Sequence, residues 1–411
     1  MTPEPCFGIL CLVTAYLAAF AVRNRVKNAD LQRARHTNLD GLQGLLTLVV
    51  FVSHAATWQQ YISDGRWRTS DAPYYTLTGQ MAIILFFMRV GFTFATKLLD
   101  HQGQRVDWVQ LYCARILRLY PAYLLALAVL VFITLNVVTP KPPSNIGFDI
   151  PAYASWLAFT VFGAPLLNGA TETNIAIAGV TWPLTYFWAF YLSLPLLAGL
   201  LGVKKTKWPV LIGSVLLIVV LRYLPYYGLV YYMLLLGVVA ALLCQNISLA
   251  TLLSGKAAGA FSIALLILAG FIADKTAYNA LSISLVGVSF YVFAAGNSLG
   301  GFLTQKTLRV LGLGAYSLYL FHGPFLFVVL KQLQKNYPGF YTNDLVYWSL
   351  ISLASSLLVW TCLAVHLFLE VPAMRKVAPM SQSVHKLFSR FCKSAAAAWF
   401  HIKSINTKNS I

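Results

Sequence analysis

The chain has 411 residues, of which 59% are hydrophobic and only 10% are charged. This balance excludes a soluble globular domain and is typical of an integral membrane protein. The formal net charge of +18 is interpreted as membrane topology and attraction to anionic lipid headgroups rather than binding to nucleic acid, because no DNA-binding motif accompanies it.

Long apolar stretches determine the predicted fold. A spanning helix needs about 20 mainly apolar residues, and the sequence predicts an all-α bundle of about 11 transmembrane helices. The predicted spans are residues 5–22, 39–61, 80–99, 119–137, 179–202, 208–222, 226–244, 257–272, 278–298, 310–331 and 345–368. The stretch 151–167 is ambiguous, since its prolines and polar flanks favour a short helix that lies in the interface or re-enters it.

The first span precedes its basic residues, so we expect a retained anchor rather than a cleaved signal peptide. With the N-terminus outside and loops assigned alternately, most Lys and Arg residues fall on the cytoplasmic side, which follows the positive-inside rule. The basic run 23–36 and the basic, aromatic-containing tail are expected to lie on the membrane surface. Three parts are predicted: an anchor with its linker (1–37), a membrane domain (38–373) and an amphipathic cytoplasmic tail (374–411).

The second predicted span, NLDGLQGLLTLVVFVSHAATW, carries polar residues on an apolar helix. Asp40 and Gln43 precede His54 by 14 and 11 residues, so at about 100° per residue each lies within about 40° of the histidine around the helix. Ionisable groups inside membranes are usually functional. The alternatives are a packed histidine bonded to a neighbouring helix and, for Asp40, a helix-start residue beside Gly41.

Arginines occur in the next two predicted spans. Arg89 is placed near mid-membrane, where an isolated charge costs at least about 2.5–3.5 kcal/mol, so we expect it to face the bundle interior. Arg115 and Arg118 lie one turn apart, just before Pro121. Guanidinium groups match phosphate geometry and would hold a nucleotide-like donor; the alternative is that both arginines are ordinary topology anchors at the inner membrane edge.

A second polar stripe places Tyr316, Tyr319 and His322 at three-residue steps. Counting about 1.5 Å per residue from the inner end of each span, His54 and His322 are expected at about 22 and 18 Å, close to one level. In a water-poor bundle an imidazole can accept a hydroxyl proton while the oxygen attacks a thioester. The six cysteines include no CxxC pair, so neither a disulfide framework nor a metal site is predicted.

Six blocks together carry a family resemblance over about residues 38–373. In chain order they are LDGLQGLLTLVVFVSHA, GQMAIILFFMRVGF, DWVQLYCARILRLYPAY, GVTWPLTYFWAFYLSLPLL, LGLGAYSLYLFHGP and HLFLEVP. The sequence resembles the acyltransferase 3 family of integral membrane O-acyltransferases. The resemblance implies a ten-helix core in the bacterial inner membrane, acyl-CoA (commonly acetyl-CoA) as cytoplasmic donor, no tightly bound cofactor, and a glycan or lipid-linked saccharide as acceptor.

The resemblance also implies residue roles. His54 falls on the family's catalytic histidine, and Arg115 and Arg118 match the paired arginines before P-x-Y, which would bind the donor. From its own position on the same helix face, Asp40 is expected to orient groups at the cytoplasmic mouth, as a catalytic candidate with His54, and to line the donor path with Gln43. The remaining matches are Trp182 in the W-x-L-x-x-E-W block, Tyr316, Ser317, Tyr319 and His322 in the Y-S-x-Y-L-x-H block, and Glu370 in the closing E-x-P.

Four positions depart from the family pattern. Gln43 stands where the family has a basic residue, Val90 replaces Ser or Thr, and Phe187 replaces Glu, whereas Arg89 adds a cation at a usually apolar position. Two explanations stay open: a rebuilt site in which Arg89 supplies the missing charge, or a fold that binds ligand with impaired catalysis. A transporter or flippase is a further alternative, because transporters also place polar residues at mid-membrane, although no inverted repeat is seen.

Overall fold

The structure is a computed structural model that describes residues 4–26, 31, 36–138, 149–203, 207–221, 223, 225 and 227–390. Helices make up the secondary structure of this part of the chain, and no strand occurs in it. Most of the surface helix expected over 23–36 and the tail beyond residue 390 lie outside the described residues.

The helices are α1 (Pro5–Val22), η1 (Arg23–Arg25), α3 (Thr37–Asp64), α4 (Pro73–Leu99), α5 (Trp108–Ile133), η2 (Thr134–Val138), α6 (Ile150–Leu157), α7 (Thr173–Ala176), α8 (Trp182–Leu200), α9 (Lys207–Leu221), α10 (Tyr227–Leu243), α11 (Ile247–Leu253), α12 (Lys256–Ile272), α13 (Ala280–Ala294), η3 (Phe302–Thr304), α14 (Lys306–Leu313), α15 (Ala315–Asn336), η4 (Phe340–Thr342), α16 (Asp344–Val365), η5 (His366–Glu370) and α17 (Val371–Met374).

The all-α membrane architecture is confirmed, but the expected count of about 11 spans is not. Among the described residues, 6 helices are long and apolar enough to cross a membrane, or up to 8 if each bent pair is one span. The pairs α10–α11 and α14–α15 are bent by 111° and 67°, and α9, α12 and α13 are shorter apolar helices. Each predicted apolar run does contain a helix. The count differs because some of these helices are too short to span a membrane and others are bent, and apolar composition alone predicts neither the length of a helix nor a bend in it. In the ambiguous stretch, only Ile150–Leu157 is an α-helix.

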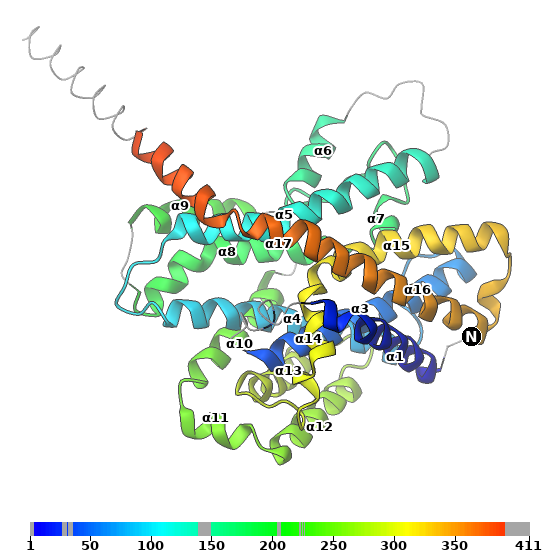
Figure 1. Ribbon diagram of the computed structural model, residues 1–411, viewed down its shortest axis with the longest axis horizontal. Coiled ribbons are helices and arrows are strands. Elements are labelled where there is room, and N and C mark those ends of the chain that lie inside the picture. Colours follow the sequence, from blue (N-terminus) through cyan, green and yellow to red (C-terminus); the bar gives the residue numbers. More distant parts are fainter. Residues whose placement is uncertain are drawn as a thin grey trace, which may run out of the picture.

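Glycines let α3 approach its neighbours closely. An added Cβ at Gly41 would overlap the Leu303 carbonyl, and one at Gly44 would overlap the Leu308 carbonyl. Small residues at such crossings allow helix backbones to touch in membrane bundles. The Asn38 side chain donates to the Phe293 carbonyl at 2.6 Å. The start of α3 is therefore held against α13, η3 and α14; α13 and α14 lie beside it in Figure 1.

A second close crossing holds α4 against α10. Gly91 faces the Leu234 carbonyl and Gly237 faces the Met88 carbonyl, each too closely for a Cβ. The segment of α4 around Arg89 is consequently fixed in place by backbone contact on both sides of that residue.

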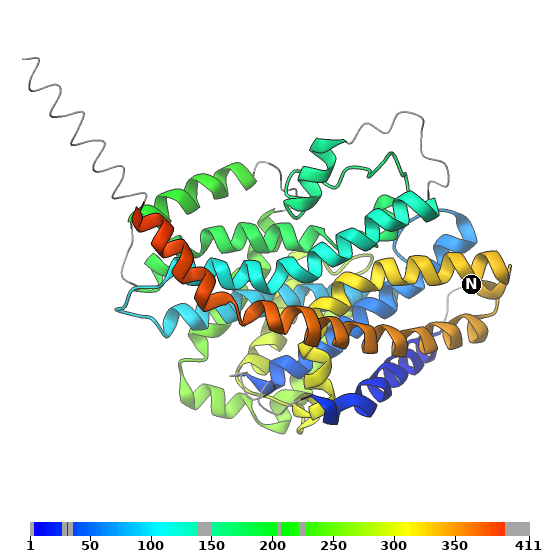
Figure 2. The same ribbon diagram turned by 45° about the horizontal axis from the view of Figure 1, so that its top comes forward.

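The helices α5, α15 and α16 run along the bundle in Figure 2, and α1 packs on α16. The indole N–H of Trp360 donates to the Ala18 carbonyl at 2.9 Å across the α1–α16 contact. We call the end of the bundle with Arg115 the arginine end, and the opposite end, with Trp67, the tryptophan end. Helices α3, α5 and α15 all run from the arginine end towards the tryptophan end, whereas α4 and α16 run in the opposite direction.

Candidate active site

Two histidines from α3 and α15 meet in the bundle interior. His54 Nδ1 lies 3.3 Å from His322 Nε2, and the ring centroids are 4.8 Å apart. The two residues are 268 positions apart in sequence, so the packing of α15 against α3 brings them together. The expectation that they share one level is confirmed, and we refer to them as the histidine pair.

Backbone carbonyls define which ring nitrogens carry protons in the neutral pair. His54 Nδ1 is 2.9 Å from the Val50 carbonyl, and His322 Nδ1 is 3.2 Å from the Leu318 carbonyl. Carbonyl oxygens only accept, so each Nδ1 donates. The single Nδ1 hydrogen of His54 is then shared between the Val50 carbonyl and His322 Nε2, and in this tautomer His54 Nε2 carries the lone pair that can take a proton.

A cavity of about 220 Å³ lies near the histidine pair, although neither histidine is among its lining residues. Its wall includes Tyr319, whose ring centroid is 5.9 Å from that of His322. The cavity is lined by Gln43, Ile83, Phe86, Phe87, Arg89, Val90, Thr93, Phe94, Arg115, Arg118, Leu119, Pro183, Leu184, Phe187, Tyr191, Ala315, Tyr316 and Tyr319. We refer to it as the arginine cavity. All four positions that depart from the family pattern lie in its wall.

Arg89 forms an ion pair with Asp40, 2.6 Å from Nη2 to Oδ1, and also donates to the Leu39 carbonyl. Both side chains are largely buried, with exposed fractions of 19% and 22%. Arg89 therefore faces the bundle interior, as expected, and reaches from α4 to the start of α3. Asp40 neutralises this cation and is not among the residues that line the cavity.

The two arginines of α5 have different surroundings. Arg118 Nη1 lies 3.5 Å from Glu370 Oε2. The Arg115 guanidinium lies over the Phe94 ring at 5.2 Å and bonds to the Tyr191 side chain, and no carboxylate pairs with it among the described residues. The arginine cavity thus holds three guanidinium groups against two nearby carboxylates, Asp40 and Glu370. This excess of positive charge suits an anionic ligand.

Glu370 is completely buried and organises a polar cluster around Arg118. It accepts hydrogen bonds from Ser317 Oγ at 2.5 Å and from His366 Nδ1 at 2.7 Å. The Tyr316 hydroxyl donates nearby to the Leu119 carbonyl at 2.8 Å. A buried carboxylate is tolerated when it is paired and hydrogen-bonded in this way, and the cluster fixes α5, α15 and η5 around the cavity.

The segment just after the one-turn helix α7 packs against the histidine pair. Gly323, next to His322, packs so closely on Ile177 that no Cβ would fit, and the Ala178 backbone is within hydrogen-bonding reach of the His54 ring. Ala178 has a φ of 52°, a left-handed conformation that costs about 1–3 kcal/mol for a residue other than glycine. Ala178 lies after the ambiguous stretch 151–167, and of the two histidines His322 is buried whereas His54 is half-buried.

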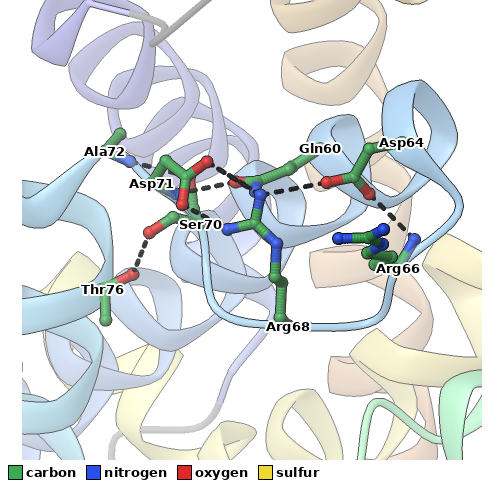
Figure 3. A network of polar contacts seen from close by, with 8 residues as sticks. All are labelled: Gln60, Asp64, Arg66, Arg68, Ser70, Asp71, Ala72 and Thr76. Carbon is green, nitrogen blue, oxygen red and sulfur yellow. Dashed lines mark hydrogen bonds and ion pairs between the residues drawn. The ribbon is translucent and has the colours of Figure 1, made fainter.

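The loop between α3 and α4 is pinned at the tryptophan end. Figure 3 shows Arg68 between Asp64 and Asp71, with Gln60 bonded to Asp71 as well. A polar cavity of about 340 Å³ adjoins this network. Its α3 residues, such as Gln60 and Ala56, lie about 120–160° around the helix from His54, so this second cavity does not face the histidine pair.

The candidate residues from the sequence thus fall into groups. Gln43, Arg89, Arg115, Arg118, Tyr316 and Tyr319 share the arginine cavity. Trp182 lies apart on α8, 39% exposed, with its ring 5.7 Å from Phe87. Sequence reasoning missed Tyr191 and His366. The four-residue spacing of His366 and Glu370 was a usable signal, since it puts both on one helix face, whereas nothing in the sequence indicated Tyr191.

Among the described residues, no group of three or more His, Cys, Asp or Glu side chains is arranged to hold a metal ion.

A protein-family model described as an acyltransferase domain matches residues 36–366 of this sequence, which is most of the chain. No curated protein and no solved structure shows significant similarity to this chain.

Proposed function

Because this chain belongs to the acyltransferase 3 family, we propose that it transfers an acyl group, most simply acetyl, from acyl-CoA to a hydroxyl of a glycan or lipid-linked saccharide. The protein is a multi-pass membrane acyltransferase by family and helix content. The donor, the acyl group, the acceptor and a location in the bacterial inner membrane, with the arginine end at the cytoplasm, belong to the proposal.

The observation that carries this proposal is the adjacency of a cationic cavity and a basic nitrogen. The arginine cavity provides Arg115 and Arg118 for the phosphates of CoA. Tyr319 in its wall has its ring centroid 5.9 Å from that of His322 of the histidine pair. A donor with its phosphates among the arginines would extend its thioester along the tyrosines towards His54.

The residues then have defined roles in one balanced step. His54 Nε2 takes the proton from the acceptor hydroxyl while that oxygen attacks the thioester carbonyl carbon. The new C–O ester bond forms, the C–S bond breaks, and the CoA thiolate leaves with the proton that His54 Nε2 had taken, which restores the neutral imidazole. His322 accepts a hydrogen bond from His54 Nδ1 and so orients the ring and stabilises the imidazolium that forms.

The position of Arg89 favours the explanation that the site has been rebuilt over the explanation that its catalysis is impaired. It lines the same cavity as Gln43, Val90 and Phe187, the positions at which polar or charged groups of the family pattern are absent. Asp40 fixes the Arg89 side chain at 2.6 Å. In this proposal Arg89 supplies from α4 the cation that Gln43 does not supply from α3.

The proposal is tested with purified full-length protein and acetyl-CoA by following release of the CoA thiol and transfer of labelled acetyl to saccharides extracted from the cell envelope. His54→Ala should lower transfer by about 10²–10⁴-fold, the range for loss of a general base. His101→Ala, which removes an exposed histidine beyond α4, serves as the control and should leave the rate unchanged. Wild-type transfer that persists in His54→Ala would refute the role of His54.

A further inference from the structure

A buried tryptophan N–H on α3 has no acceptor. Trp58 is 1% exposed, and no described protein group accepts a hydrogen bond from its Nε1. Other buried tryptophans satisfy this group: Trp156 donates to the Pro165 carbonyl at 2.9 Å, and Trp348 donates to Gln59 Oε1 at 3.1 Å. Buried donors without an acceptor are rare and costly, so this one requires an explanation.

The position of Trp58 supplies the explanation. Trp58 follows His54 by four residues, so it lies about 40° around α3 and about 6 Å further along it. Its ring meets that of Phe327 of α15 at 5.7 Å, and α15 also carries His322. The Trp58–Phe327 contact thus joins the two helices that carry the histidine pair, and it lies about one turn beyond the pair towards the tryptophan end. One other buried indole N–H without an acceptor, that of Trp188, is on α8, which carries neither histidine.

Two further rings surround Trp58. Its ring lies edge-on to Tyr61 at 5.3 Å and to Trp67 at 5.2 Å. Trp67 comes from the pinned loop between α3 and α4, and both Trp67 and Tyr61 are half-buried. The Tyr61 hydroxyl donates to Glu172 at 3.1 Å. Aromatic rings with a nearby polar group suit a sugar ring, whose C–H groups pack on aromatic surfaces while its oxygens accept hydrogen bonds.

We propose that Trp58, Tyr61 and Trp67 form the acceptor subsite, in which Trp58 Nε1–H donates to an oxygen of a hydroxyl-bearing saccharide whose reacting hydroxyl lies at His54. This inference rests on the proposed acyl transfer. The acyl donor reaches the histidine pair past Tyr319, and the acceptor reaches it from the tryptophan end. Trp58 transfers no proton, because an indole N–H acts here only as a hydrogen-bond donor that orients the acceptor.

Trp58→Phe tests the subsite, because it removes the N–H and keeps an aromatic ring. With labelled acetyl-CoA and a titrated saccharide extract of the cell envelope, its KM for the saccharide should rise about three- to tenfold, as for loss of one uncharged hydrogen bond. The melting temperature should equal or exceed that of wild type, because an unsatisfied donor has been removed.

The matched control is Trp348→Phe, which also replaces a fully buried tryptophan but leaves Gln59 Oε1 without its donor. Its melting temperature should fall, while its KM for the saccharide should not change. An unchanged KM in Trp58→Phe, or a fall in its melting temperature as large as that of Trp348→Phe, would overturn the subsite. If wild type transfers no acetyl, the proposed function fails and the subsite fails with it. If wild type transfers acetyl but Trp58→Phe has the same KM for the saccharide, the subsite is overturned and the proposed function stands.

Discussion

Replacing Arg89 by leucine should separate its contribution to stability from its contribution to activity. The guanidinium and the Asp40 carboxylate are about 4 Å apart between charge centres, which gives a gross attraction of about 4 kcal/mol at an effective dielectric constant of 20. Each side chain is only about one-fifth exposed, so either partner left alone has little solvent to compensate. We expect Arg89→Leu and Asp40→Asn each to cost about 2–3 kcal/mol, somewhat below the range for a fully buried pair.

The double variant Arg89→Leu/Asp40→Asn should be less destabilised than the sum of the singles, by about 1–2 kcal/mol. Unfolding of the purified proteins in mixed detergent micelles measures this coupling. Acetyl transfer should stay low in the double variant even where stability recovers, because the cavity has still lost Arg89. Additive destabilisation within about 0.5 kcal/mol, or recovery of transfer along with stability, would refute this reasoning.

Two further predictions concern the packing of α3 and the loop that follows it. Gly41→Ala should lower the free energy of unfolding by about 1–3 kcal/mol, because the new Cβ would overlap the Leu303 carbonyl; Gly228→Ala, with open space around it, should be neutral or stabilising by up to about 1 kcal/mol. The hydrogen bond from Arg68 lowers the pKa of Asp71 below its ordinary value of 3.8. The contribution of Asp71 to holding the loop between α3 and α4 is therefore complete above pH 3.8 and is lost as the pH falls through the lower pKa of the folded state. Amide hydrogen exchange in this loop should then increase in wild type on acidification and should be less pH-dependent in Asp71→Asn; equal pH dependence in both proteins would contradict the assignment.

Hydrophobicity predicted where the helices lie in the sequence, but it did not predict how long they are. Apolar content locates each helix, whereas the number of spans depends on bends such as the 67° break between α14 and α15. That break occurs at Gly314, where an added Cβ would lie 3.1 Å from Leu363 Cδ2 of α16. Such long-range contacts leave little trace in the local sequence.

The sequence predicted which residues belong to the site more readily than which of them contact one another. Helical spacing put Asp40, Gln43 and His54 on one stripe, and depth along the spans put His54 and His322 at one level, where the structure brings them into contact. The ion pair between Arg89 and Asp40 and the approach of Trp58 to Phe327 depend on how separate helices cross. A single sequence does not specify these crossings, because membrane helices associate by detailed packing rather than by a hydrophobic pattern.

The most direct test of the account is the O-acyl content of the envelope saccharides in cells that carry either the wild-type protein or His54→Ala at equal membrane levels. Alkali-labile acetate per unit of saccharide measures it. The account predicts that the acyl groups which depend on the wild-type protein are absent with His54→Ala. Equal O-acyl content in the two strains would contradict the assignment of His54 as the base that activates the acceptor.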